Sequence, residues 1–196
     1  VDGLPFSQYG IKALTKGGDS TTYHADLTVL PDHNISIAVL TTGGSSLYAT
    51  LMSKKILTQY LLENGIIEQP DEDAAFQPPV QVEMPEKLAS YSGLYSTGTF
   101  YTGRTAAITV DNGAVTIAGG MGGMVPEETL VFTGNGLFVS EDGSKTVTFL
   151  EETNGETYLV SKQYLEFPGL GRYVLNGHLF QRVQPQVLDK SVADAW

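Results

Sequence analysis

The sequence contains no cysteine, which excludes disulfide bonds, thiol nucleophiles and cysteine-based zinc sites. Basic residues are scarce, because 11 Lys and Arg stand against 22 Asp and Glu and leave a net charge of -11. This balance argues against nucleic acid and against an anionic membrane surface as partners, since both attract Lys and Arg. No apolar run approaches the roughly 20 residues of a spanning helix, so we predict no membrane span.

What is present describes a folded protein. Of the 196 residues, 41% are hydrophobic and 17% are charged, which is not the composition of a disordered chain. The length allows one large domain or two small ones. The lack of cysteine fits an exported bacterial protein, so we expect it in the cell envelope or outside the cell, with the cytoplasm as the alternative. Because the chain opens with Val1 rather than Met, we also expect a piece of a longer protein.

Residues 68–86 predict an acidic, proline-rich linker. Proline interrupts regular structure, and the stretch shows no hydrophobic periodicity. The linker would separate a first region, residues 1–67, from a second region, residues 87–196. Its acids are Glu68, Asp71, Glu72, Asp73, Glu83 and Glu86, and its prolines are Pro70, Pro78, Pro79 and Pro85.

The first region predicts a β-hairpin followed by a helix. Residues 23–30 and 35–42 have strand composition, and the intervening Pro31–Asn34 favours a turn. Residues 35–40 are apolar at nearly every position, which predicts a strand covered on both faces. A helix is expected from Ser45 or Ser46 to Asn64, with apolar residues at helical spacing. Two strands and one helix are too little for an independent core.

The second region predicts a closed or nearly closed antiparallel barrel of about eight strands. Turn dipeptides recur between short stretches of strand composition, at spacings of roughly ten residues. The overall fold class is therefore mainly β: an incomplete α/β piece followed by a barrel. The predicted turns are Asp111-Asn112-Gly113, Asn135-Gly136, Asp142-Gly143, Asn154-Gly155 and Asn176-Gly177.

The aromatic residues of the second region allow two interpretations. They could line a ligand cup, or they could fill the barrel, which for about eight strands is just wide enough for its side chains to meet. Core filling is the commoner outcome when no polar groups converge. The residues are Tyr95, Phe100, Tyr101, Phe132, Phe138, Phe149, Tyr158, Tyr164, Phe167, Tyr173 and Phe180.

The segment Lys16-Gly17-Gly18-Asp19 is the candidate site. A lysine at a strand edge followed by two glycines lets a carbonyl substrate approach the backbone, and a following N–H could act as an oxyanion donor. The same four residues also suit a plain turn. His24, His33 and His178 have no second ligand at metal-binding spacing. We therefore predict neither a metal nor a cofactor.

The sequence carries no recognisable nucleophile with its base. It contains no Ser-x-x-Lys, Gly-x-Ser-x-Gly, Tyr-x-Asn or His-Glu-x-x-His, the patterns that accompany nucleophilic or zinc-dependent hydrolysis. The chain on its own is therefore expected to be inactive in acyl transfer.

Residues 9–67 nevertheless resemble a known family. Tyr9-Gly10, the 16–19 segment, the turn Leu30–Asn34, a strand ending at Thr42 and a last helix follow one another as they do at the end of serine β-lactamase-like hydrolases. This superfamily includes class C β-lactamases, penicillin-binding proteins and esterases. Thr42 stands where the family often has Asn. Leu88–Tyr95 resembles the opening of the lipocalin-like barrel that many of these hydrolases carry after the catalytic domain.

The resemblance implies roles for the candidate residues. Lys16 would assist binding of a substrate carboxylate and proton transfer near the nucleophile, and the backbone N–H of Asp19 would be the second oxyanion donor. The family's Ser-x-x-Lys and Tyr-x-Asn lie far N-terminal to this segment and are absent here.

Two functions follow as expectations. The first is the C-terminal portion of a bacterial serine hydrolase that acts on peptides, esters or β-lactams through an acyl-enzyme, with the N-terminal catalytic portion as its partner. The alternative is a non-catalytic module, in which the barrel binds a ligand or holds a second copy of the chain.

Overall fold

A computed structural model describes residues 6–69, 75–97, 105–119 and 127–184. The chain divides into two compact units. Unit 1 comprises Val1–Ala75 and Gln163–Leu175, and unit 2 comprises Phe76–Lys162 and Asn176–Trp196. The predicted linker therefore lies partly in each unit, and its residues 70–74 are outside the described part.

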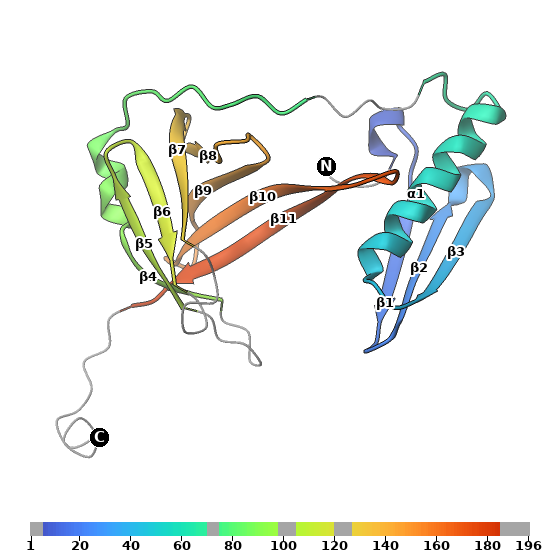
Figure 1. The fold of residues 1–196 in the computed structure, drawn as a ribbon, viewed down its shortest axis with the longest axis horizontal. Coiled ribbons are helices and arrows are strands. Elements are labelled where there is room, and N and C mark those ends of the chain that lie inside the picture. Colours follow the sequence, from blue (N-terminus) through green and yellow to red (C-terminus); the bar gives the residue numbers. More distant parts are fainter. Residues whose placement is uncertain (1–5, 70–74, 98–104, 120–126, 185–196) are drawn as a thin grey trace, which may run out of the picture. The chain divides into compact units, whose positions relative to one another are not determined.

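Unit 1 is a three-stranded antiparallel sheet with a helix on one face (Figure 1). The strand order follows the sequence, so each strand pairs with its neighbour along the chain. The elements are η1 (Ser7–Tyr9), β1 (Leu14–Asp19), β2 (Tyr23–Leu30), η2 (Pro31–His33), β3 (Ile35–Thr42) and α1 (Ser46–Glu63).

The core of unit 1 lies between α1 and the sheet. Leu30 from β2 and Leu57 and Leu61 from α1 are buried together. Residues from both flanks of the sheet and helix complete the cluster, namely Phe6, Ile11, Ala13 and Ile67. This small core explains how so few elements form a folded unit.

The predicted hairpin and helix of the first region are confirmed at nearly the same boundaries. The interpretation of residues 16–19 as a plain turn is wrong, because they belong to β1 and pair residue by residue with β2. The expectation that β3 is covered on both faces is also wrong for the described residues, since Leu40 is 79% exposed. Residues 16–19 have low β propensity, and it is their pairing with β2 that makes them a strand.

Unit 2 contains a closed antiparallel barrel, as the sequence predicted. Its strands follow one another in order, and β10 closes against β9 while β11 pairs with β4. A short helix, η3 (Glu86–Tyr91), precedes it. The strands are β4 (Gly93–Ser96), β5 (Thr105–Asp111), β6 (Ala114–Ala118), β7 (Glu128–Gly134), β8 (Leu137–Val139), β9 (Lys145–Glu151), β10 (Thr157–Phe167) and β11 (Gly171–Arg182).

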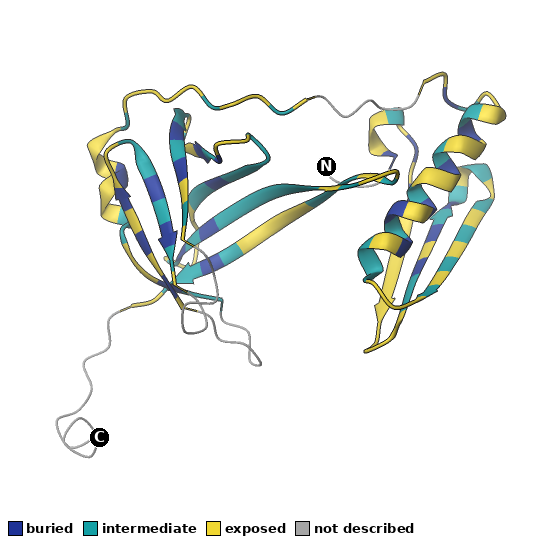
Figure 2. Ribbon diagram, in the orientation of Figure 1, coloured by how far each residue is buried: buried dark blue, intermediate teal, exposed yellow. Residues whose placement is uncertain are grey.

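Buried residues recur along the barrel strands (Figure 2), and their side chains form one core cluster. Phe138 lies with its ring centroid 5.3 Å from that of Phe132 and 6.1 Å from that of Phe149. Tyr95 is fully buried and donates a hydrogen bond to the carbonyl of Tyr91 at 2.7 Å. Burial raises the pKa of Tyr95 to about 12. These contacts favour core filling over a ligand cup; Phe100 and Tyr101 lie outside the described residues.

The turn predictions of the second region are right with one exception. Asn112 and Asn135 adopt left-handed φ angles of 48° and 50°, as turns between adjacent strands require. Asn176-Gly177 is not a turn, because both residues lie inside the continuous strand β11. The chain reverses earlier, where the N–H of Leu170 donates to the carbonyl of Phe167 at 2.9 Å.

The last part of the predicted linker lies on the barrel. The N–H of Val82 donates to the carbonyl of Phe132 at 3.0 Å, and the amide of Gln81 donates to the carbonyl of Asn112 at 3.2 Å. Among the described residues, no helix has the length and apolar character needed to cross a bilayer.

Candidate functional site

The sheet of unit 1 has two different faces. Asp26, Thr28 and Leu30 of β2 are buried on the face toward α1. The alternate positions form the opposite face, here called the open face, because successive side chains of a strand point to opposite sides. The open face consists of Leu14, Lys16, Gly18, Tyr23, Ala25, Leu27, Val29, Ser36, Ala38, Leu40 and Thr42.

The open face is apolar and largely solvent-exposed in the described structure. Tyr23 is 66% exposed and Leu40 79% exposed, and Leu14 and Leu27 are also exposed. Lys16 is the one charged residue in this set. Large exposed apolar patches are rare on monomeric proteins and commonly mark interaction sites.

Asp19 joins three elements of unit 1. Its carboxylate pairs with Nδ1 of His24 on β2, whose side chain is only 10% exposed. The hydrogen bond from His24, and then those from the hydroxyl and backbone N–H of Ser46, hold the pKa of Asp19 below its usual range. Ser45, which the sequence offered as a helix cap, makes no side-chain capping bond. The Asp19 carboxylate therefore acts on the start of α1 as well as on His24.

A second carboxylate, Asp26, is buried between β2 and α1. It is 3% exposed and accepts hydrogen bonds from the hydroxyls of Thr28 at 2.9 Å and Thr50 at 3.1 Å. The hydroxyl of Ser53, on the next turn of α1, is buried without a hydrogen-bond partner. Polar side chains therefore lie between the sheet and α1, where the rest of the core is apolar.

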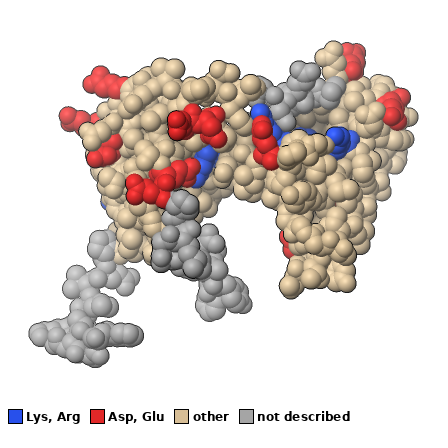
Figure 3. Space-filling view, viewed as in Figure 1, with Lys and Arg blue, Asp and Glu red and all other residues tan. Residues whose placement is uncertain are grey.

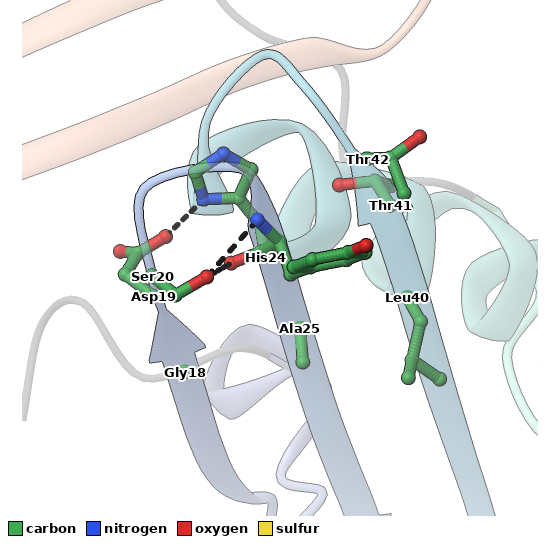
Figure 4. A pocket seen from close by; sticks show the side chains of 9 residues that line it. Gly18, Asp19, Ser20, His24, Ala25, Leu40, Thr41 and Thr42 are labelled. Carbon is green, nitrogen blue, oxygen red and sulfur yellow. Dashed lines mark hydrogen bonds and ion pairs between the residues drawn. The ribbon is translucent and has the colours of Figure 1, made fainter.

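A hollow of about 550 Å³ lies at the end of the sheet where β1 passes into β2. Figure 4 shows its lining: the Asp19–His24 pair on one side, and Ala25 and Leu40 projecting together away from the His24 ring. Most of the lining surface is apolar. The residues are Gly18, Asp19, Ser20, Tyr23, His24, Ala25, Leu40, Thr41 and Thr42.

The structure separates the four predicted site residues. Lys16 and Gly18 belong to the open face, whereas Gly17 and Asp19 alternate toward α1. The ammonium of Lys16 donates to the carbonyl of Gly17. All four residues are exposed. The side chains of Lys16 and Asp19 therefore do not act as one constellation, since the Asp19 carboxylate pairs with His24.

Gly17 and Gly18 have no structural reason to be glycine. Neither has a left-handed φ, and among the described residues added Cβ atoms would meet only the carbonyl oxygen of Ala25 at 3.8 Å and its Cβ at 3.9 Å, respectively. These are ordinary contacts. Glycine in a strand costs stability and often marks the close approach of a ligand or another backbone.

Sequence reasoning missed His24, Tyr23 and Leu40 as parts of a site. His24 looked isolated because its partner Asp19 becomes its neighbour only through the register of β1 against β2. The available signal was the short spacing from Asp19 to His24, which would face each other across a tight hairpin. No comparable signal exists for Leu40, which comes from β3.

Helix α1 also presents apolar side chains outward. Tyr48, Met52, Ile56 and Tyr60 follow one another at intervals of four residues and are each between 37% and 50% exposed. Within unit 1, the ring of Phe167 packs edge-on against Tyr48, with centroids 5.1 Å apart. Figure 3 shows acidic side chains over much of the barrel, whereas unit 1 is mostly uncharged in that view.

The barrel carries a second, polar hollow of about 450 Å³. His178 lies 3.7 Å from the carboxylate of Glu152, and its ring packs edge-on against Tyr158. Thr153 and Asn154 complete the lining. In the described part of the chain, no three His, Asp or Glu side chains gather as a metal site would require.

Comparisons with known proteins give limited information. No family model matches the sequence, and no curated protein matches it. A solved structure of SurE with D-Leu matches with a TM-score of 0.45 and 16% identity, over 87% of this chain and 35% of that chain. Another SurE structure matches with a TM-score of 0.38 and 16% identity, over 86% and 34%. The chain thus spans about a third of these proteins, and likenesses this weak support no functional argument.

These comparisons overturn the resemblance to β-lactamase-like hydrolases with a lipocalin-like barrel. The solved structures that match are named SurE, and no family model of such a hydrolase matches. Several of the supporting residues are explained by turn geometry, since Gly10 and Asn34 end short helical turns with φ of 69° and 55°. Many unrelated folds share such turns. The closed barrel itself remains.

Proposed function

We propose that β1 is the substrate-binding edge of a hydrolase that works through an acyl-enzyme, with its nucleophilic serine supplied by a segment outside these 196 residues. The observation that carries the proposal is the pair Gly17 and Gly18. Neither glycine is required by the backbone or by packing. Their lack of side chains serves an extended substrate that approaches the strand closely.

The position of β1 supports this role. It is paired with β2 on one side, and it is the first strand in the order of the sheet. An edge strand offers N–H and C=O groups to an extended peptide or acyl chain. Lys16, exposed beside the glycines, would attract a developing negative charge, and a backbone N–H near Asp19 would serve as an oxyanion donor.

Labelling of the native protein with a fluorophosphonate probe tests the proposal. We expect the labelled serine to lie outside residues 1–196. Lys16→Ala should slow labelling by about 10²–10³-fold, the usual cost of one electrostatic contributor. Lys12→Ala is the matched control, because Lys12 is exposed and precedes β1. Labelling of a serine within these residues, or equal rates for both variants, would refute the proposal.

The exposed apolar residues of unit 1 favour a second candidate, a non-catalytic binding or assembly module. The stripe from Tyr48 to Tyr60 on α1 and the open face of the sheet each offer a surface for association. Absence of any labelled serine in the native protein, together with sedimentation as a dimer, would support this candidate over the hydrolase.

A further inference from the structure

Strand β3 is an edge strand without the features that usually prevent pairing with another strand. Among the described residues it pairs with β2 alone, along its whole length and without a bulge, and Figure 1 shows it at one edge of the sheet. Natural proteins protect such edges with charged residues, proline or bulges. Ile35–Thr42 contains no charged residue and no proline, whereas the opposite edge, β1, carries Lys16 and Asp19.

Four residues of β3 direct their backbone groups away from β2. The N–H of Gly43 donates to the carbonyl of Thr22 at 2.8 Å, which fixes the phase of the β2–β3 ladder. Hydrogen-bonded and non-hydrogen-bonded pairs alternate along an antiparallel ladder, so Thr41, Val39 and Ile37 form the bonds to β2. The N–H and C=O groups of the intervening residues therefore point outward, and these residues are Ser36, Ala38, Leu40 and Thr42.

The side chains of β3 that face α1 are only partly covered. Ile35, Ile37 and Val39 are half-buried, although the β2 residues opposite them are buried. A further strand beside β3 would cover this row and bind the outward backbone groups at the same time.

We propose that the protein dimerises by antiparallel pairing of β3 with β3 of a second copy, which joins two three-stranded sheets into one. The sequence of β3 fits its own copy. With Val39 on the two-fold axis, Ala38 lies opposite Leu40 of the second copy and Ser36 lies opposite Thr42, so all four outward-facing residues exchange backbone hydrogen bonds. Such a two-fold contact closes on itself. The proposal goes beyond the hydrolase and does not depend on it, because β1 stays free.

The distribution of charge favours a second copy as the occupant. Residues 6–67 contain four lysines and four acidic residues, so the net charge of -11 is carried by the rest of the chain. Since β3 has no charged side chain, two identical edges meet without the repulsion that like charges opposite one another would cause.

The helices leave room for this arrangement. Helix α1 lies over β2, since the hydroxyl of Thr50 donates to the carboxylate of Asp26 at 3.1 Å and Leu57 and Leu61 are buried with Leu30. A two-fold axis perpendicular to the sheet puts both helices on the same face. Strand β2 and its copy would be three strand spacings apart, roughly 14 Å, which accommodates two helices with diameters of roughly 10–12 Å.

Sedimentation of the 196-residue chain over a range of concentrations tests the proposal, and we expect a monomer–dimer equilibrium. Ala38→Pro removes an outward N–H and leaves the bonds to β2 in place, because an edge strand tolerates proline where its N–H faces solvent. It should raise the Kd of the dimer at least about tenfold, since each copy loses a hydrogen bond across the contact. Thr15→Pro is the matched control, because the N–H of Thr15 points outward from the β1 edge, and it should leave this Kd within about twofold.

A cysteine cross-link tests the register. The chain has no cysteine of its own, so an introduced cysteine can pair only with its copy. Val39→Cys puts two Cα atoms roughly 4.5 Å apart across the axis, within the range that a disulfide spans. On oxidation it should give a covalent dimer on a non-reducing gel. Ala38→Cys and Thr15→Cys should cross-link at least about tenfold more slowly, because neither lies opposite its own copy.

A chain that sediments as a monomer at every concentration would overturn the proposal, and so would equal cross-linking of the three cysteine variants. An equal loss of dimer in Ala38→Pro and Thr15→Pro would also overturn it, because association would then not be specific to β3. If Ala38→Pro does not fold, the cross-linking rates decide. The proposed function fails separately: if the native protein has no serine that labels but Val39→Cys cross-links, the dimer stands and the hydrolase does not.

Discussion

The barrel and unit 1 place their apolar residues differently. In the barrel, β5 alternates strictly between exposed and buried positions, and Ala106, Ile108 and Val110 all point into the core. In unit 1, β3 alternates as well, but its exposed positions include Ala38 and Leu40. The apolar side chains of β5 are buried in the barrel core, whereas the open face of unit 1 leaves apolar side chains exposed to solvent. On this ground we propose that the function resides in unit 1.

The contrast between the two units predicts its largest effect on the free energy of unfolding for a substitution in the barrel core. Phe138→Ala should lower the free energy of unfolding by about 3–5 kcal/mol, because a buried aromatic side chain is replaced by a cavity. Leu40→Ala, at a side chain that is 79% exposed, should change it by less than about 0.5 kcal/mol. Urea denaturation measures both. A large loss for Leu40→Ala would show that the open face is covered in solution.

The buried carboxylate of unit 1 gives the next largest effect. Asp26→Ala leaves the hydroxyls of Thr28 and Thr50 without their buried acceptor, which typically costs about 1–3 kcal/mol. Asp32→Ala is the control, since Asp32 is exposed in η2. The loss is read from the thermal unfolding of α1 by circular dichroism. Equal midpoints for the two variants would contradict the structural role of Asp26.

Hydrogen exchange sharpens the contrast between the units. Amides of β2 and β3 should exchange at least about tenfold faster than those of β5 and β6, because local stability follows the amount of buried apolar contact. If the protein associates through residues 1–67, the difference should shrink as concentration rises. Strong protection of residues 22–62 in a chain that sediments as a monomer would contradict this expectation.

The smallest effect concerns pH. The folded state lowers the pKa of Asp19, so its ion pair contributes stability above the unfolded pKa, and that contribution disappears as the pH falls through the folded value. Asp19 is well exposed, so the effect is modest. The unfolding midpoint of unit 1 should decline below about pH 4, and this part of the decline should be absent in Asp19→Asn. Asp32→Asn, with the same change in charge, should keep it.

The sequence predicted much of the fold because local chemistry determines it. The helix from Ser46 follows from its apolar residues at helical spacing, and the turns at Asn112 and Asn135 follow from left-handed backbone preferences. Strand β1 was not predictable in this way, since Gly17 and Gly18 disfavour a strand and only pairing with β2 imposes one. The turn expected at Asn176-Gly177 failed for the opposite reason, because pairing carries β11 straight through it.

The site was only partly predictable. Lys16 and the glycines stood out as residue types, and the structure leaves them exposed at a strand edge. The Asp19–His24 pair and the open face depend on which residues face each other across strands. A one-residue shift in register would move every one of these side chains to the other face. Composition carries no information on that register, and spacing indicates it only across a tight hairpin, as for Asp19 and His24.

The contact between Asp19 and Ser46 has a consequence for how the protein folds. A helix that is capped by its own preceding residue can begin to form alone, but Ser45 makes no capping bond to α1, and the carboxylate that interacts with Ser46 comes from the β1–β2 hairpin. Its first turn should therefore be frayed in the denatured ensemble and close only after the hairpin has its register. Substitutions at Asp19 should accordingly alter the unfolding rate more than the folding rate. The hairpin would thus fold first and determine where the helix begins.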